Sequence, residues 1–89
     1  QAQGQEILKV RIEDENDKNI IFQCLKSLET VAVVDFISAS ENVFEVQSKP
    51  GMSSRRPVFE LCVKNKWVLT ELSFVETRLE DIFRNLTMN

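Results

Sequence analysis

Few residues in this sequence could do chemistry, and their types exclude the common catalytic groups. The chain has 89 residues and no histidine, which removes the commonest general base and the commonest metal ligand of proteins. The hydroxyl groups that could serve as nucleophiles have neither a histidine nor a suitably placed lysine as their base. These hydroxyl groups belong to Ser53, Ser54, Thr70 and Thr77. We therefore predict no catalytic residue and expect that the chain is not an enzyme.

The acidic run 13–17 is the first candidate for a metal site. It holds four carboxylates in five residues, but it lacks the central glycine and the terminal glutamate of a calcium-binding EF-hand loop. Carboxylates are also favourable beside the free amides at the start of a helix, where Asn16 or Asp17 can be the cap. We interpret the run as a solvated helix cap and predict no bound metal.

Cys24 and Cys62 each fall within a helical pattern of apolar residues, and their spacing matches no metal site. Free cysteine is among the most buried residue types, so we interpret both as reduced core residues of a cytosolic protein. A disulfide between them is the alternative. The two glycines, Gly4 and Gly51, cannot assemble a phosphate-binding loop, so no cofactor is predicted for this chain.

Arg55 and Arg56 form the one concentrated basic feature, between a Pro-Gly turn and Pro57. Held on the rim of a loop, two guanidinium groups can pair with carboxylates of a neighbouring domain or with anionic lipid headgroups. A solvated loop is the alternative interpretation. Trp67 is expected to be a core residue, and a role in an interface is the alternative. These three residues are the candidate contacts with a partner.

Charge and hydropathy limit the kinds of partner. The net charge of −3 lacks the basic field that binding to a phosphate backbone needs, so nucleic acid is not expected. The apolar runs are far shorter than the ~20 residues required to cross a bilayer, and no signal-peptide pattern is present. An apolar fraction of 43% with 28% charged residues predicts one small folded domain over residues 6–89.

Periodicity predicts four strands and three helices in this domain. Residues 1–5 are polar, and we interpret them as the remnant of a linker. Strands are predicted at about 6–13, 30–40, 43–48 and 67–75, and helices at about 17–29, 54–65 and 78–87. Ser53 or Ser54 is the predicted cap of the second helix, with Pro57 in its first turn. The order of the elements predicts an α+β fold, a ferredoxin-like split βαβ sandwich with a four-stranded antiparallel sheet, two helices on one face and a C-terminal helix at an edge.

Alternation in the second and fourth strands predicts which side chains face the core. The residues expected to point inward are Ala32, Val34, Phe36, Val68, Leu72 and Phe74. The opposite face of the sheet is expected to be open, with charges of both signs and no aromatic ring, which excludes an RNA-recognition domain. The residues expected on this open face are Lys9, Arg11, Asp35, Glu45, Gln47, Glu71 and Ser73.

The segment 77–87 has the clearest helical pattern. Its apolar residues are Leu79, Ile82, Phe83 and Leu86, which share one face of a helix. Thr77 and Glu80 have the spacing of a capping box. A helix this short is marginal alone in water, so we expect it to dock on the rest of the domain.

The same segment carries a resemblance to a known family. Leu79-Glu80-Asp81-Ile82-Phe83, followed by Leu86-Thr87, resembles the ending of ATP-binding subunits of bacterial ABC transporters of the drug-export and gliding-motility type. The resemblance extends more weakly through residues 67–72 and through the order of the elements. The family usually has Ser or Thr directly before the first leucine, where this chain has Arg78.

The resemblance implies a non-catalytic C-terminal accessory domain downstream of an ATPase core. The full-length parent would hydrolyse ATP with magnesium in the cytoplasm, peripheral to the inner membrane through a transporter complex. The implied partners are the ATPase domain of the same chain, a second ATP-binding subunit or the membrane permease, with a homodimer as a further option. The alternative is a free-standing module of the same fold for small-molecule sensing or dimerisation.

Overall fold

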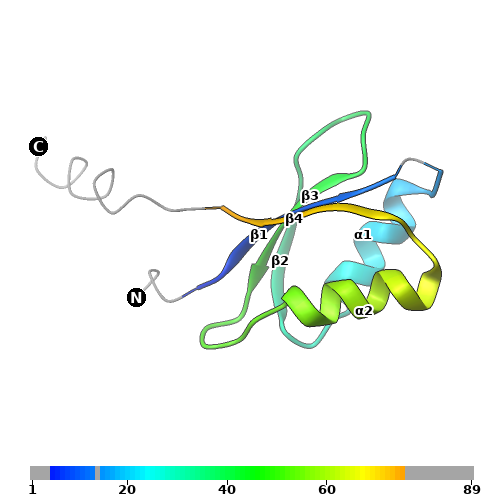
Figure 1. Ribbon diagram of the computed structural model, residues 1–89. Helices are drawn as coiled ribbons and strands as arrows, with labels where there is room; N and C mark the ends of the chain where they lie inside the picture. Colours follow the sequence, from blue (N-terminus) through cyan, green and yellow to red (C-terminus); the bar gives the residue numbers. More distant parts are fainter. Residues whose placement is uncertain (1–4, 14, 76–89) are drawn as a thin grey trace, which may run out of the picture.

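The computed structural model describes residues 5–13 and 15–75. The elements follow the predicted order: β1 (Ile7–Ile12), α1 (Lys18–Lys26), β2 (Val31–Phe36), β3 (Val43–Ser48), α2 (Arg55–Asn65) and β4 (Leu69–Phe74) (Figure 1). The predicted helix 78–87 and its motif residues lie outside the described residues. So do residues 1–4 of the predicted linker.

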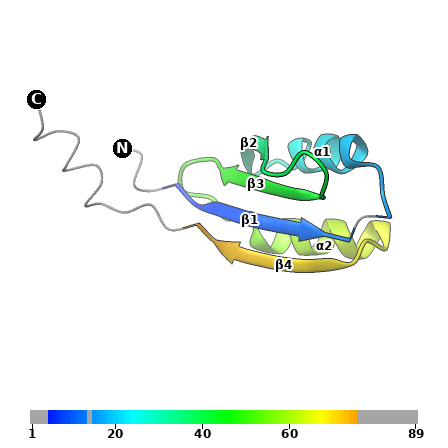
Figure 2. The same cartoon turned by 90° about the horizontal axis from the view of Figure 1, so that it is seen from above.

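The four strands form one antiparallel sheet in the order β2-β3-β1-β4. β1 and β3 are therefore central, and β2 and β4 are the two edges. Both helices cover the same face of this sheet (Figure 1 and Figure 2). The arrangement confirms the predicted α+β class, and it is the layout of a ferredoxin-like sandwich.

The core lies between the sheet and the two helices. It is built by the alternating residues of the central strands and by residues three or four apart on each helix. Its fully buried members include Leu8, Val10, Ile12, Phe44 and Val46 from the sheet and Ile21, Leu25 and Val58 from the helices. Trp67 is half-buried and packs against this core.

The start of α1 shows how the acidic run is used. Asp17 is the N-cap, and its Oδ1 accepts hydrogen bonds from the amides of Asn19 at 2.8 Å and Ile20 at 3.4 Å. The buried Asn42 donates from Nδ2 to the carbonyls of Glu13 at 3.3 Å and Asn16 at 3.1 Å. The run is therefore a helix cap tied to the end of the sheet. Among residues 5–13 and 15–75, no group of three or more potential metal ligands is gathered.

A register shift in β2 corrects part of its predicted inward set. Val31 pairs with Ser48 and Val33 with Gln47, so Ala32 between them has no cross-strand partner of its own. Ala32 is exposed as a result, contrary to the prediction, because such a bulge moves a residue out of the alternation. Val34 is buried and Asp35 is exposed, as predicted.

A second shift corrects β4. Leu72 pairs with Val10, but Leu69 rather than Thr70 pairs with Ile12. Leu69 therefore takes the inward place that was predicted for Val68, and Val68 is exposed.

The phenylalanines of the two edge strands were predicted inward, but both are exposed, Phe36 at 46% and Phe74 at 59%. Phe36 pairs with Phe44, and Phe74 pairs with Leu8, so both lie on the helix-covered face. Each is the last residue of an edge strand, so a neighbouring strand lies on one side only. Phe36 compensates by stacking on Phe22 of α1, with 4.6 Å between ring centroids.

The cysteines are both free thiols, so the disulfide alternative is not formed. Cys62 is buried in α2, and Cys24 is half-buried in α1. Burial raises the pKa of the Cys62 thiol to about 11, so this thiol stays protonated and unreactive at neutral pH. In the described part of the chain, no helix is both long enough and apolar enough to cross a lipid bilayer.

Candidate interaction surface

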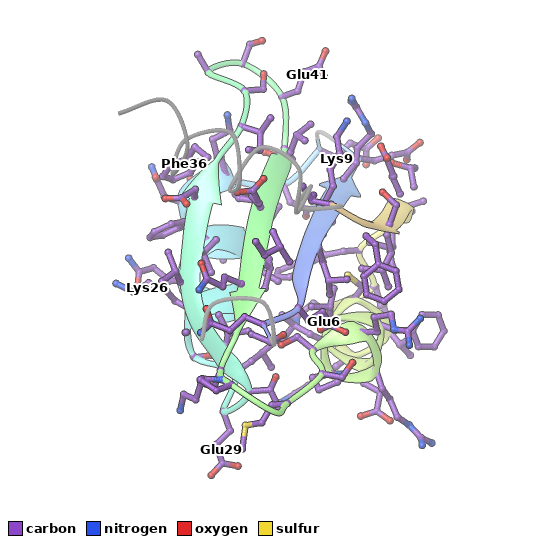
Figure 3. All side chains as sticks on the ribbon, turned by 90° about the vertical axis from the view of Figure 1, so that its left-hand side faces the viewer. Glu6, Lys9, Lys26, Glu29, Phe36 and Glu41 are labelled. Carbon is purple, nitrogen blue, oxygen red and sulfur yellow. The ribbon has the colours of Figure 1, made fainter. Side chains whose placement is uncertain are left out.

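The start of α2 is held by a carboxylate from the beginning of the domain. Glu6, just before β1, accepts a hydrogen bond at Oε1 from the amide of Ser54, the N-cap residue of α2, at 2.7 Å. The hydroxyl of Ser48 donates to the same oxygen at 2.8 Å, and that of Ser53 donates to Oε2 at 2.7 Å. Figure 3 shows Glu6 between the end of the sheet and α2. The positive end of the α2 dipole therefore faces an internal anion.

A chain of hydroxyl groups extends this contact into the interior. Ser54 Oγ lies 2.7 Å from Ser48 Oγ and 2.8 Å from Thr30 Oγ1, and both serines are fully buried. We call Glu6, Ser48, Ser53, Ser54 and Thr30 the Glu6 cluster. Because the Ser54 hydroxyl is used inside the cluster, it makes no hydrogen bond to a helix amide. Ser54 is thus the cap by position, as predicted, but Glu6 performs the role of the acid in a capping box.

The Glu6 carboxylate is ionised at neutral pH. Its burial works to raise the pKa, but hydrogen bonds from the Ser54 amide and the hydroxyls of Ser53 and Ser48, with the charge of Arg55, outweigh burial. The pKa is therefore lowered from its ordinary value of 4.5. The lowered pKa makes this carboxylate less basic than an ordinary one, and so less suited to remove a proton from the hydroxyls that donate to it. The arrangement is suited to fixing a helix to a sheet.

Arg55 lies beside the Glu6 cluster, at the surface of the domain. The structure places it in the first turn of α2, as the predicted helix 54–65 implied, and not on the rim of a loop. Its Nε lies 3.8 Å from Glu6 Oε2, and its guanidinium carbon lies 4.8 Å from the centroid of the Phe74 ring. Two contacts from two elements therefore orient this cation, although more than half of its side chain is in solvent.

Arg56 is the freest of the three predicted contact residues. Its side chain is 86% exposed, and its Nε lies 3.1 Å from Oε2 of Glu60, one helical turn further along. Such an exposed pair is weak and can exchange for a partner's carboxylate. Trp67 follows the other end of α2, so the structure does not bring the three residues into one patch. The candidate interaction surface is the start of α2, with Arg55 and Arg56.

The open face of the sheet holds the side chains that the sequence predicted. Lys9 lies opposite Glu45 and Ser73, and Arg11 lies opposite Glu71. Arg11 forms an ion pair with Glu41 at 2.7 Å, and Lys9 approaches Glu71 at 3.8 Å. Lys9 and Glu41 are labelled in Figure 3. The three phenylalanines of the described strands all lie on the other face or its margin. This face therefore carries charges of both signs and no ring for base stacking.

Two features of the surface were missed by sequence reasoning. One is the Glu6 cluster, because Glu6 looks like an ordinary first residue of a strand and its partners lie more than forty positions away. The other is a pair of lysines over aromatic rings: Lys18 Nζ lies 5.6 Å from the Phe36 centroid, and Lys26 Nζ lies 5.7 Å from that of Phe22. Neither feature has a local sequence pattern.

Comparisons of this chain with protein-family models, with curated proteins and with solved structures found no match. A functional hypothesis therefore depends on the fold, on the start of α2 and on the resemblance of residues 79–87.

Proposed function

We propose that this chain is a non-catalytic accessory domain of an ABC transporter ATP-binding protein of the gliding-motility or drug-export type. Residues 79–83 and 86–87 support the family, and the order of the elements agrees with it. The domain would bind no cofactor itself, while its parent would use ATP and magnesium. The parent would lie in the cytoplasm, peripheral to the inner membrane through its transporter complex.

The observation that carries the non-catalytic role is the Glu6 cluster. It gathers a carboxylate and several hydroxyl groups, the combination from which a catalytic site would be built, and it uses them to fix α2 on the sheet. Every buried polar side-chain atom among the described residues has a hydrogen-bond partner. This internal satisfaction of buried donors and acceptors supports a structural role for the Glu6 cluster.

The start of α2 is the part of this arrangement that faces outward. Arg55 is oriented by Glu6 and Phe74, and Arg56 beside it has its charge largely in solvent. A guanidinium held on a rigid helix is well suited to bidentate pairing with a carboxylate. We therefore propose that the start of α2 contacts acidic side chains of the ATPase core or of a transporter partner.

The experiment uses the full-length parent, with Arg56→Glu as the variant and Lys64→Glu as the control. Both change a cation to an anion on the same helix, and Arg56→Glu places an anion near the helix N-terminus, where the helix dipole favours it. We expect Arg56→Glu to weaken complex assembly or to change the ATPase rate by roughly tenfold, as for a contact worth about 1.4 kcal/mol. Lys64→Glu should leave both unchanged. Equal effects of the two variants, or none from either, would reject the contact.

Removal of residues 6–89 from the parent tests the broader role. We expect intact ATP binding, because the phosphate-binding loop would lie in the core, together with altered ATPase regulation or assembly. An unaltered rate and an unaltered complex would argue against an accessory role.

The alternative function, a small-molecule-sensing module, is tested by thermal unfolding of the chain in the presence of a panel of amino acids and nucleotides. A ligand at a hundred times its dissociation constant adds about 2.7 kcal/mol of stability, and we expect no such shift.

A further inference from the structure

One edge of the molecule carries large apolar side chains that the two-layer sandwich leaves in solvent. Phe59 and Val63, one turn apart on α2, are 55% and 62% exposed, and Phe74 at the end of β4 is 59% exposed. Arg55 connects them, because it precedes Phe59 by one turn and lies over the Phe74 ring. We call Phe59, Val63 and Phe74, with the stem of Arg55, the α2–β4 strip.

The strip lies where the described chain ends. β4 runs back alongside α2, so that its last residues lie next to the first turn of α2 (Figure 1 and Figure 2). The contact of 4.8 Å between Arg55 and the Phe74 ring fixes this neighbourhood. The chain therefore leaves Val75 at one end of the strip, with fourteen residues still to follow.

Those fourteen residues include an amphipathic sequence of matching length. Its apolar stripe, Leu79, Ile82, Phe83 and Leu86, has helical spacing and lies within the eleven residues 77–87. Eleven residues of α-helix extend about 16 Å, and α2 also has eleven residues. Three residues, Val75 to Thr77, separate the end of β4 from the predicted helix 78–87 and are available to reverse the direction of the chain, which is an ordinary connection length.

We propose that residues 77–87 of this chain fold back as a helix along α2 and cover the α2–β4 strip. The short connection to Val75 gives the segment an effective concentration in the millimolar range at this surface, which a second molecule at micromolar concentration does not match. Of the other exposed apolar residues, Val33, Phe36 and Ile37 lie on or next to the β2 edge, three strand spacings or about 14 Å away across the sheet. Ile20, Met52 and Val68 lie on α1, before α2 and before β4. The inference does not depend on the proposed function.

The test is a double-mutant cycle in the full 89-residue chain, with Phe59→Ala and Phe83→Ala. If the two rings are in contact, their effects on the unfolding equilibrium constant should depart from additivity by roughly fivefold. The matched control replaces Phe59→Ala with Ile20→Ala, because Ile20 is a comparably exposed residue on α1. The control cycle should be additive within roughly twofold. Additivity in both cycles overturns the proposal.

A second measurement uses the unmodified chain and so does not depend on a variant that folds. We expect nuclear Overhauser contacts between the methyl groups of Val63 and the ring of Phe83, unchanged on tenfold dilution, with a sedimentation coefficient of a monomer. Absence of these contacts overturns the proposal. Contacts that weaken on dilution, with a dimer at the higher concentration, also overturn it, because the occupant would then be a second copy.

Discussion

The amides at the start of each helix of this domain donate to a carboxylate, but the two carboxylates come from different parts of the chain. α1 begins on Asp17, which accepts from amides two and three residues ahead. α2 begins on Glu6, which accepts from the amide of Ser54, 48 positions later in the chain. The first contact can form as soon as one helical turn forms, whereas the second requires β1 and α2 to be already assembled. The local cap therefore stabilises a helix, and the remote cap stabilises the tertiary arrangement.

The largest expected effect comes from removing the remote cap. Glu6→Ala should lower the free energy of unfolding by about 3 kcal/mol, because it leaves the Ser54 amide and the buried Ser48 hydroxyl without their charged acceptor. Glu6→Gln keeps the shape and one acceptor and should cost less. Urea denaturation monitored by the fluorescence of Trp67 measures both. A loss below 1 kcal/mol for Glu6→Ala would show that water replaces the carboxylate.

Removal of the local cap should cost less. Asp17→Ala should lower the free energy of unfolding by about 1 kcal/mol, which is typical for loss of a side-chain cap. Asp17→Asn should recover most of this, because its side-chain oxygen can still accept from Asn19 and Ile20. The same urea experiment measures both variants. If Asp17→Ala cost as much as Glu6→Ala, the distinction between local and remote caps would fail.

The pH dependence of stability gives a smaller and more specific effect. The folded-state pKa of Glu6 is below its ordinary value of 4.5, so the unfolded chain binds the proton more readily. The stability that the ionised Glu6 supplies is complete above that ordinary value and is lost as pH falls through the folded-state pKa. The difference in free energy of unfolding between the unmodified chain and Glu6→Gln should therefore shrink as pH falls from 6 toward 3. A constant difference over that range would contradict the assignment.

The smallest effects belong to the exposed cations beside the remote cap. Arg55→Ala should cost about 0.5 kcal/mol, because an ion pair at 3.8 Å and one cation–π contact are both partly in solvent. Arg56→Ala should leave stability unchanged within the error of the measurement. Thermal unfolding at low and high salt compares the two, and the Arg55 effect should diminish with salt. A large effect at Arg56 would mean that its charge supports the fold and is not free for a partner.

The contrast between the caps also shows what the sequence could predict. Asp17 was one of two predicted caps, because the preference for such residues at helix starts acts within a few positions. The element order was predictable for the same reason, since period-two and helical patterns are local. The ferredoxin-like arrangement followed from that order, because few topologies connect these elements without long crossings.

The features that sequence reasoning missed all depend on the pairing of distant segments. The exposure of Ala32 and the inward turn of Leu69 come from register shifts, which are set by the neighbouring strand. The exposure of Phe74 depends on its place at the end of an edge strand. Glu6 could not be assigned because an isolated acidic residue at a strand start is usually solvated. The sequence therefore predicted Arg55 and Arg56 as candidate contact residues, but it did not predict that Glu6 and Phe74 orient Arg55.

The attachment of Glu6 to Ser54 also has a mechanical consequence. A force applied to the backbone at Gln5 would meet the Glu6 cluster, the 2.8 Å side-chain bond from Gln47 to Gln5 and the backbone bond from Ser48 to Glu6 before it loaded the rest of β1. Because Glu6 is hydrogen-bonded to the N-cap residue of α2, a displacement of Glu6 would be transmitted to the start of the helix that carries Arg55 and Arg56. The start of β1 is thus mechanically coupled to the exposed cations at the start of α2.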